Sequence, residues 1–224
     1  MATARKPKSK SAVAAARRKQ KQPPWLWIGV GVLVLALAAA AIISSGGDDD
    51  SSGTAAGVVE TRSVSVTGAA LPQFPREGGA DPGVGKEMPD VTGQSFDGTP
   101  VSMTKDGKPK LILFVAHWCP HCQKEVPLLA DYLKDNPLQG VDLYTVSTSV
   151  QKNQPNYPPS EWLDEEGWTA PTLADSEDSN LADAFGLSSF PYFVAVDASG
   201  KVVARTSGEL TTEQFAALAD RARG

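Results

Sequence analysis

Apolar runs in this chain come in two lengths, and the two lengths predict different structures. A run of 19 residues without a charged side chain covers residues 25–43. As a helix it would be about 28 Å long, close to the hydrocarbon thickness of a bilayer. The later runs, such as Leu111–Ala116, are much shorter and are preceded by breaker residues, here Asp106–Pro109. Short, continuous apolar runs of this kind are typical of strands buried on both faces.

The elements predicted after the long run alternate between strands and helices. We expect two hairpins, one over 91–103 with a type I′ turn at Asp97-Gly98 and one of 192–196 and 201–206, and two further strands at 110–116 and 141–146. The expected helical segments are 120–134, a short helix near 160–166 with Ser160 as N-cap, a helical turn at 179–185 and an amphipathic helix at 211–223. This order predicts an α/β domain with a sheet of at least four strands, covered on both faces. Trp162 and Trp168 are expected to pack in its core or to cover the loop region.

Charge around the long apolar run predicts its orientation in a membrane. The first 24 residues carry eight Lys or Arg and no acid, whereas Asp48, Asp49 and Asp50 follow the run. This asymmetry, with Trp25 and Trp27 as interfacial anchors, predicts a single-pass helix in a bacterial cytoplasmic membrane with its N-terminus inside. A cleaved signal peptide is the alternative, although its apolar region is usually only about 7–15 residues long.

The rest of the chain is acidic, with 13 basic and 26 acidic residues after the N-terminal arm. An acidic domain without a basic stripe argues against nucleic acid as a partner. The predicted organisation is a basic cytoplasmic arm (1–24), a transmembrane signal anchor (25–43), a flexible Ser/Gly/Asp-rich linker (44–61), an irregular extension (62–88) and a folded domain (89–224) on the extracytoplasmic side.

Cys119 and Cys122 are the only cysteines of the chain, and they follow directly after the predicted buried strand. Cys119 falls at the start of the next helix, where free N–H groups and the helix dipole favour a thiolate. The i, i+3 spacing allows a disulfide within one turn. We therefore predict Cys119 as a nucleophilic thiol and Cys122 as its resolving partner in thiol exchange. A purely structural disulfide is the alternative, but a loop this short removes little chain entropy.

Motifs around the cysteines resemble a known family. They are Pro89-Asp90, Asp97-Gly98, Gly107-Lys108-Pro109, Trp118-Cys119-Pro120-His121-Cys122, Glu125-Val126-Pro127, Phe190-Pro191 and Asp197-x-x-Gly200. In this order they look like the membrane-anchored, TlpA-like branch of the thioredoxin superfamily, over residues 86–224. The resemblance implies a three-layer thioredoxin fold with a mixed central sheet and protein thiol-disulfide oxidoreductase activity. It also implies that Pro191 is cis beside the dithiol, leaving the Phe190 backbone free for an extended substrate.

The direction of exchange stays open at this point. The TlpA-like frame suggests a reductant, whereas Pro120-His121 between the cysteines is also found in DsbA-type oxidases. Thioredoxins proper carry a buried acid where this chain has Leu113, so the proton of Cys122 must go elsewhere, and Glu125 and His121 are the nearest candidates. Trp118, Pro120, His121, Phe190 and Pro191 are predicted to modulate the dithiol or to bind substrate.

Three other functions fit parts of the sequence. A copper metallochaperone could use the two cysteines with His117 or His121, although such crowded ligands would distort the site. A peroxidase of the peroxiredoxin type would need a Thr-x-x-Cys nucleophile, and position 116 is Ala. A non-enzymatic adaptor is the third. For the oxidoreductase we expect no metal, no cofactor beyond the Cys119–Cys122 disulfide, and as partners protein thiols or disulfides outside the membrane, including a membrane or secreted redox partner.

Overall fold

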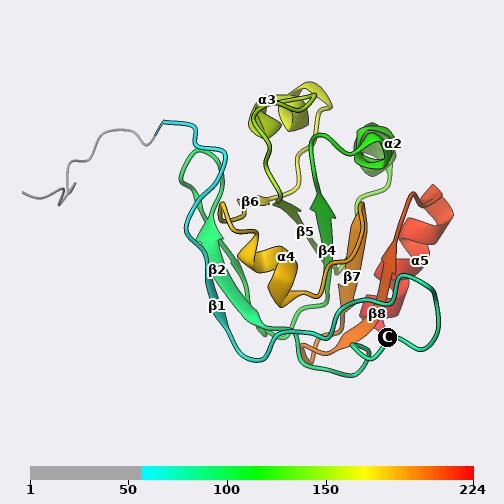
Figure 1. Ribbon diagram of the computed structural model, residues 1–224. Helices are drawn as coiled ribbons and strands as arrows, with labels where there is room; N and C mark the ends of the chain where they lie inside the picture. Colours follow the sequence, from blue (N-terminus) through cyan, green and yellow to red (C-terminus); the bar gives the residue numbers. More distant parts are fainter. Residues whose placement is uncertain (1–56) are drawn as a thin grey trace, which may run out of the picture. The chain divides into compact units, whose positions relative to one another are not determined.

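A five-stranded mixed sheet forms the centre of the protein in the computed structural model, which describes residues 57–224 (Figure 1). Its spatial order is β6-β5-β4-β7-β8, in which β4, β5 and β6 run parallel and β7 and β8 are antiparallel to their neighbours. The strands are β4 (Lys110–Val115), β5 (Asp142–Ser147), β6 (Thr172–Ala174), β7 (Tyr192–Val196) and β8 (Val202–Ser207). This confirms the predicted α/β class with a mixed sheet of at least four strands.

Helices and a second, smaller sheet cover the central sheet. The helices are α2 (Pro120–Asp135), α3 (Pro159–Glu165), α4 (Asn180–Ala184) and α5 (Thr212–Arg223). The antiparallel three-stranded sheet contains β1 (Ser65–Thr67), β2 (Asp90–Gln94) and β3 (Pro100–Met103). The predicted membrane anchor and basic arm lie outside the described residues. Within 57–224, no helix combines the length and apolar character needed to cross a bilayer.

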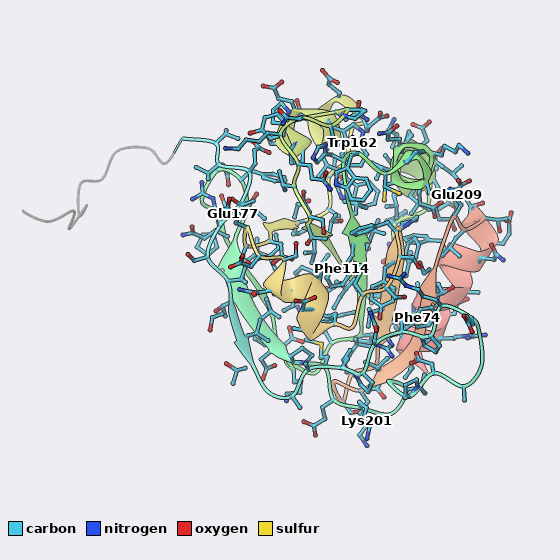
Figure 2. The ribbon with its side chains drawn as sticks, viewed as in Figure 1. Phe74, Phe114, Trp162, Glu177, Lys201 and Glu209 are labelled. Atoms are coloured by element: carbon cyan, nitrogen blue, oxygen red, sulfur yellow. The ribbon has the colours of Figure 1, made fainter. Side chains whose placement is uncertain are left out.

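Strand β4 is the centre of the core because all six of its residues are buried. Its side chains alternate between the two faces of the sheet. Leu111, Leu113 and Val115 pack with α2 and α5 on one face, whereas Ile112 and Phe114 pack with α4 and the smaller sheet on the other. Figure 2 shows Phe114 in the middle of the molecule. A strand buried on both faces fixes the position at which the following chain leaves the sheet.

The structure corrects four details of the predicted elements. The β2–β3 hairpin turns at Asp97-Gly98, but only Gly98 has a positive φ (88°), so the turn is not the type I′ turn, which needs two. Pro158, not Ser160, is the N-cap of α3, because prolines at 158 and 159 begin the helix one residue earlier. Strands β1 and β6, three residues each, were not predicted; the first lies in the extension expected to be irregular. The predicted core positions of Trp162 and Trp168 are confirmed.

Arg205 of β8 fastens the extension before β2 to the central sheet. Its guanidinium is buried and donates to both carboxylate oxygens of Asp81, and to the carbonyl oxygens of Pro72 (2.8 Å) and Phe185 (3.1 Å). It also lies 5.6 Å from the centre of the Phe74 ring, which is labelled in Figure 2. Burial alone would raise the pKa of Asp81, but the hydrogen bonds and charge of Arg205 and the N–H of Gly83 outweigh it and lower this pKa.

Asp81→Asn is expected to reduce the free energy of unfolding at pH 7 by about 2–4 kcal/mol, because it leaves the buried Arg205 charge without its partner. Since the pKa of Asp81 is lowered in the folded state, its contribution is present above about pH 4 and is lost as the pH falls through the lowered value. Urea denaturation of both proteins from pH 7 to pH 3 measures the difference. The control Asp220→Asn removes the exposed partner of Arg223 and should cost less than about 1 kcal/mol. Equal losses for the two variants would contradict this account.

Candidate active site

Cys119 lies at the junction between β4 and α2, as the sequence predicts. It is the N-cap residue of α2, with extended backbone angles (φ −77°, ψ 119°), and Pro120 follows in the first turn. The N–H of Cys119 donates to the Ala116 carbonyl at 2.9 Å, and its own carbonyl accepts from Gln123 at 3.0 Å. The thiol therefore lies beside the free N–H groups of the first helical turn, where negative charge is favoured.

The two thiols differ in exposure and in pKa. Cys119 is 7% exposed and Cys122 is 0% exposed, and both are free thiols in the structure. The pKa of Cys119 is lowered to about 5, first by the hydrogen bond from Cys122 and, against the cost of burial, by the N–H groups of Cys122 and His121 and the charge of His121. The same hydrogen bond and burial raise the pKa of Cys122. The pair therefore consists of one stabilised thiolate and one neutral thiol.

The peptide bond between the predicted residues Phe190 and Pro191 is cis as expected, and Phe190 packs against the core cluster that contains both cysteines. The Trp118 ring meets the Phe190 ring edge to face at 5.9 Å, and the Trp118 indole N–H donates to the Ser149 carbonyl at 2.7 Å. Phe190 and His121 line one hollow of about 410 Å³ together with Ser189, Ser207, Gly208 and Glu209. The structure thus brings Phe190, from a distant part of the chain, against Trp118 and His121, the residues on either side of Cys119-Pro120.

His117, considered from the sequence as a possible copper ligand, lies in the interior of the protein. The residue is completely buried, and burial lowers its pKa. Its Nδ1 is 2.7 Å from the Pro155 carbonyl oxygen, and its Nε2 accepts from the Gln151 N–H at 3.1 Å. Both nitrogens are hydrogen bonded, so His117 is not available as a copper ligand. In the part of the chain that the structure describes, no group of three or more His, Cys, Asp or Glu side chains is placed to hold a metal ion.

Glu125, one of the two proton acceptors considered from the sequence, is buried in α2 one turn after Cys122. It is 1% exposed, and the Leu210 N–H donates to both of its carboxylate oxygens at 3.1 and 3.0 Å. Burial raises its pKa to about 7, the Leu210 N–H opposes this, and the charge of Glu209 adds to it. The Glu125 charge in turn contributes to the raised pKa of Cys122. The charges of Glu125 and of the resolving thiol therefore influence each other.

His121, the other candidate, points to a partner that sequence reasoning missed. Its Nδ1 lies 2.6 Å from Oε1 of Glu209, and Lys124 Nζ lies 3.4 Å from the same oxygen. His121 is 61% exposed and Glu209 39%. Glu209 comes from the turn between β8 and α5, and Figure 2 shows it between α2 and α5. Because 88 residues separate it from His121, no local pattern could have identified it.

Comparisons with known proteins agree with this fold and this enzyme class. A thiol:disulfide interchange protein DsbE homolog of Paracoccus denitrificans is 28% identical over 135 residues, covering 59% of this chain and 70% of that protein. The thiol-disulfide oxidoreductase ResA of Geobacillus thermodenitrificans is 27% identical over 133 residues, covering 59% and 74%. Among solved structures, a thiol:disulfide interchange protein of the thioredoxin family from Chlorobium tepidum TLS has a TM-score of 0.52 at 24% identity, covering 62% of this chain and 97% of that one.

These similarities confirm the thioredoxin-like fold, and the names of the relatives confirm the predicted enzyme class. The TlpA-like branch stays a prediction, as do the roles of individual residues. A family model described as the AhpC/TSA family matches residues 84–205, which include the strand, the dithiol, the active-site helix and the cis proline. Since that match covers more than half of the sequence, the chain belongs to the AhpC/TSA family.

Proposed function

We propose that this protein is an extracytoplasmic, membrane-anchored thiol-disulfide oxidoreductase that exchanges disulfides with other proteins through Cys119 and Cys122. The observation that carries the proposal is the inequality of the two thiols: Cys119 has a pKa of about 5 at the helix N-terminus, and Cys122 is fully buried with a raised pKa. Exchange needs this inequality, because one thiolate must attack while the second thiol waits to resolve the mixed disulfide.

In the reducing direction, the Cys119 thiolate attacks one sulfur of a partner disulfide. The partner S–S bond breaks, a mixed disulfide with Cys119 forms, and one partner thiolate leaves and takes up a proton. Cys122 then loses its proton and attacks the Cys119 sulfur, which releases the second partner thiolate. The partner gains two electrons and the Cys119–Cys122 pair becomes a disulfide. The reverse sequence oxidises a partner dithiol.

Glu125 is the proposed acceptor of the Cys122 proton. In thioredoxins proper, a buried acid at the strand position that corresponds to Leu113 has this role. Here Leu113 is an apolar residue of the core, so the proposed acid comes from helix α2 instead of from the strand. A carboxylate with a pKa of about 7 is suited to take and return a proton at neutral pH. Trp118, Phe190 and Pro191 provide the surface beside Cys119 on which an extended partner segment lies.

The proposed location follows from residues 1–56, which precede the described part. Eight basic residues before the apolar run and three aspartates after it favour a cytoplasmic N-terminus and an outside domain. The proposed partners are therefore secreted or membrane proteins with thiols or disulfides. The domain boundaries at 24, 43, 61 and 88 are part of the same proposal.

Two alternatives have less support. A copper chaperone would lose His117 as a ligand, because both of its nitrogens are hydrogen bonded in the interior. A peroxidase would need a threonine hydroxyl three residues before the nucleophile, where the chain has the buried Ala116. Neither feature affects disulfide exchange.

Cys119→Ser is expected to lower insulin-type disulfide exchange by at least about a thousandfold, because the attacking sulfur is lost. Cys122→Ser should keep the first attack but not the resolution, so partners remain covalently bound to Cys119 and appear as reducible adducts on non-reducing gels. Each variant is the control for the other, since the chain has no third cysteine. Full activity of Cys119→Ser would refute the proposal.

The reduction potential of the pair is expected between about −270 mV and about −120 mV, the values for thioredoxin and DsbA. The reason is that a Cys119 pKa of about 5 lies between their thiolate pKa values of about 7 and about 3.5. Equilibration with glutathione buffers measures it. A value at or below that of thioredoxin would show that thiolate stabilisation does not control this couple.

Glu125→Gln is expected to slow resolution of the mixed disulfide by about a hundredfold and to remove the limb of the pH–rate profile near pH 7.

The Glu125→Gln substitution should also raise the free energy of unfolding at pH 8. Because the pKa of Glu125 is raised to about 7, its contribution to stability is present below about pH 4.5 and is lost as the pH rises through 7, whereas glutamine remains neutral. We expect a gain of about 1–3 kcal/mol at pH 8 and little change at pH 4.

Asp131→Asn is the control, since it removes an exposed acid from the same helix. It should change neither the rate nor the unfolding free energy by more than about 0.5 kcal/mol. A Glu125→Gln protein with an unchanged pH profile would exclude the carboxylate as proton acceptor.

A further inference from the structure

Three consecutive residues between β8 and α5 each bond to a different part of the active site. The Gly208 N–H donates to the Pro191 carbonyl at 2.9 Å. The Glu209 carboxylate binds His121, and the Leu210 N–H donates to Glu125. The backbone on both sides of Glu209 is thus held by the cis-proline segment and by α2. This fixes the origin of the Glu209 side chain relative to the imidazole.

The charged groups around the His121–Glu209 pair come from two elements. From α2 there are Lys124 on the exposed side and Glu125 in the interior, and from the β8–α5 turn there is Glu209. Lys124 binds the same Glu209 oxygen as His121, so it balances part of the carboxylate charge. Of these groups, Glu209 alone is hydrogen bonded to the imidazole.

We propose that Glu209 is a positioning residue for thiol exchange: its carboxylate binds Nδ1 of His121 and holds the imidazole in place beside Cys119, where the imidazole charge stabilises the Cys119 thiolate and the reduced pair. This inference rests on the function proposed above and describes how the same site is tuned. The effect is indirect, since the carboxylate charge alone would oppose a nearby thiolate. The charge that lowers the pKa of Cys119 is that of His121, whereas the bond to His121 lowers the pKa of Glu209.

Glu209→Gln in the full-length protein tests the proposal. The pKa of Cys119 is measured from the rate of iodoacetamide alkylation between pH 3 and pH 8, and the reduction potential from glutathione equilibration. We expect the pKa of Cys119 to rise by about half a unit to one unit, so that alkylation below this pKa slows about three- to tenfold. The couple should become more reducing in the same measurement series.

Glu213→Gln is the matched control, because it removes one exposed carboxylate from the start of α5, where the nearby groups are Thr211 and Thr212. It should leave the pKa of Cys119 unchanged. His121→Gln provides the second background: there, Glu209→Gln should no longer raise the pKa of Cys119. This double-mutant comparison separates an effect through His121 from a general effect of charge.

Three outcomes would overturn the proposal: no shift in Glu209→Gln, a downward shift, or an equal upward shift in the His121→Gln background. Circular dichroism of each variant verifies that it is folded, which an exposed position favours. If the proposed function is wrong, the result is different: the wild-type protein then shows no disulfide exchange, regardless of the pKa of Cys119 in the variants.

Discussion

The proposed thiol exchange depends on the position of one sulfur atom at the N-terminus of α2. The N–H groups of His121 and Cys122 point towards the Cys119 sulfur and, with the thiol of Cys122, lower its pKa. These hydrogen bonds form only if the start of α2 keeps its position relative to the end of β4. That position is fixed because β4 is buried on both faces, and because Val126 and Leu129 of α2 pack in the same core. The large hydrophobic core therefore serves to hold a few polar groups around one thiolate.

Sequence could predict the features that arise from local patterns. The buried strand 110–116, the helix after it and the i, i+3 cysteines are all encoded within about 25 consecutive residues, and the structure agrees with each of them. The last hairpin and the amphipathic helix after it could also be predicted from local patterns. The structure shows that Thr211 caps this helix, in a capping box with Gln214. Short strands such as β6 could not be predicted, because three residues are too few to show a periodic pattern. The conformation of β6 depends on its pairing with β5.

The polar partners of the site could not be predicted, because they come from distant parts of the chain. Leu210 meets Glu125 across 85 residues, and Pro155 meets His117 across 38. For His117 the sequence suggested a possible copper ligand, since the histidine lies only two residues before Cys119. In the structure, His117 connects the 150–158 loop to the segment before Cys119 through its hydrogen bonds with Pro155 and Gln151. Such tertiary contacts cannot be predicted from a local pattern.

The burial of Cys122 one helical turn from Cys119 also determines what an oxidant can damage. A thiolate with a pKa of about 5 is the form that peroxides convert to sulfenic acid, and further oxidation of that acid is irreversible. The neighbouring thiol condenses with a sulfenic acid to form a disulfide, the same state that exchange produces. Since Cys122 is 0% exposed, it is itself shielded from such attack. In the proposed cycle, the arrangement that orders the steps of exchange would thereby also return an oxidised Cys119 to use.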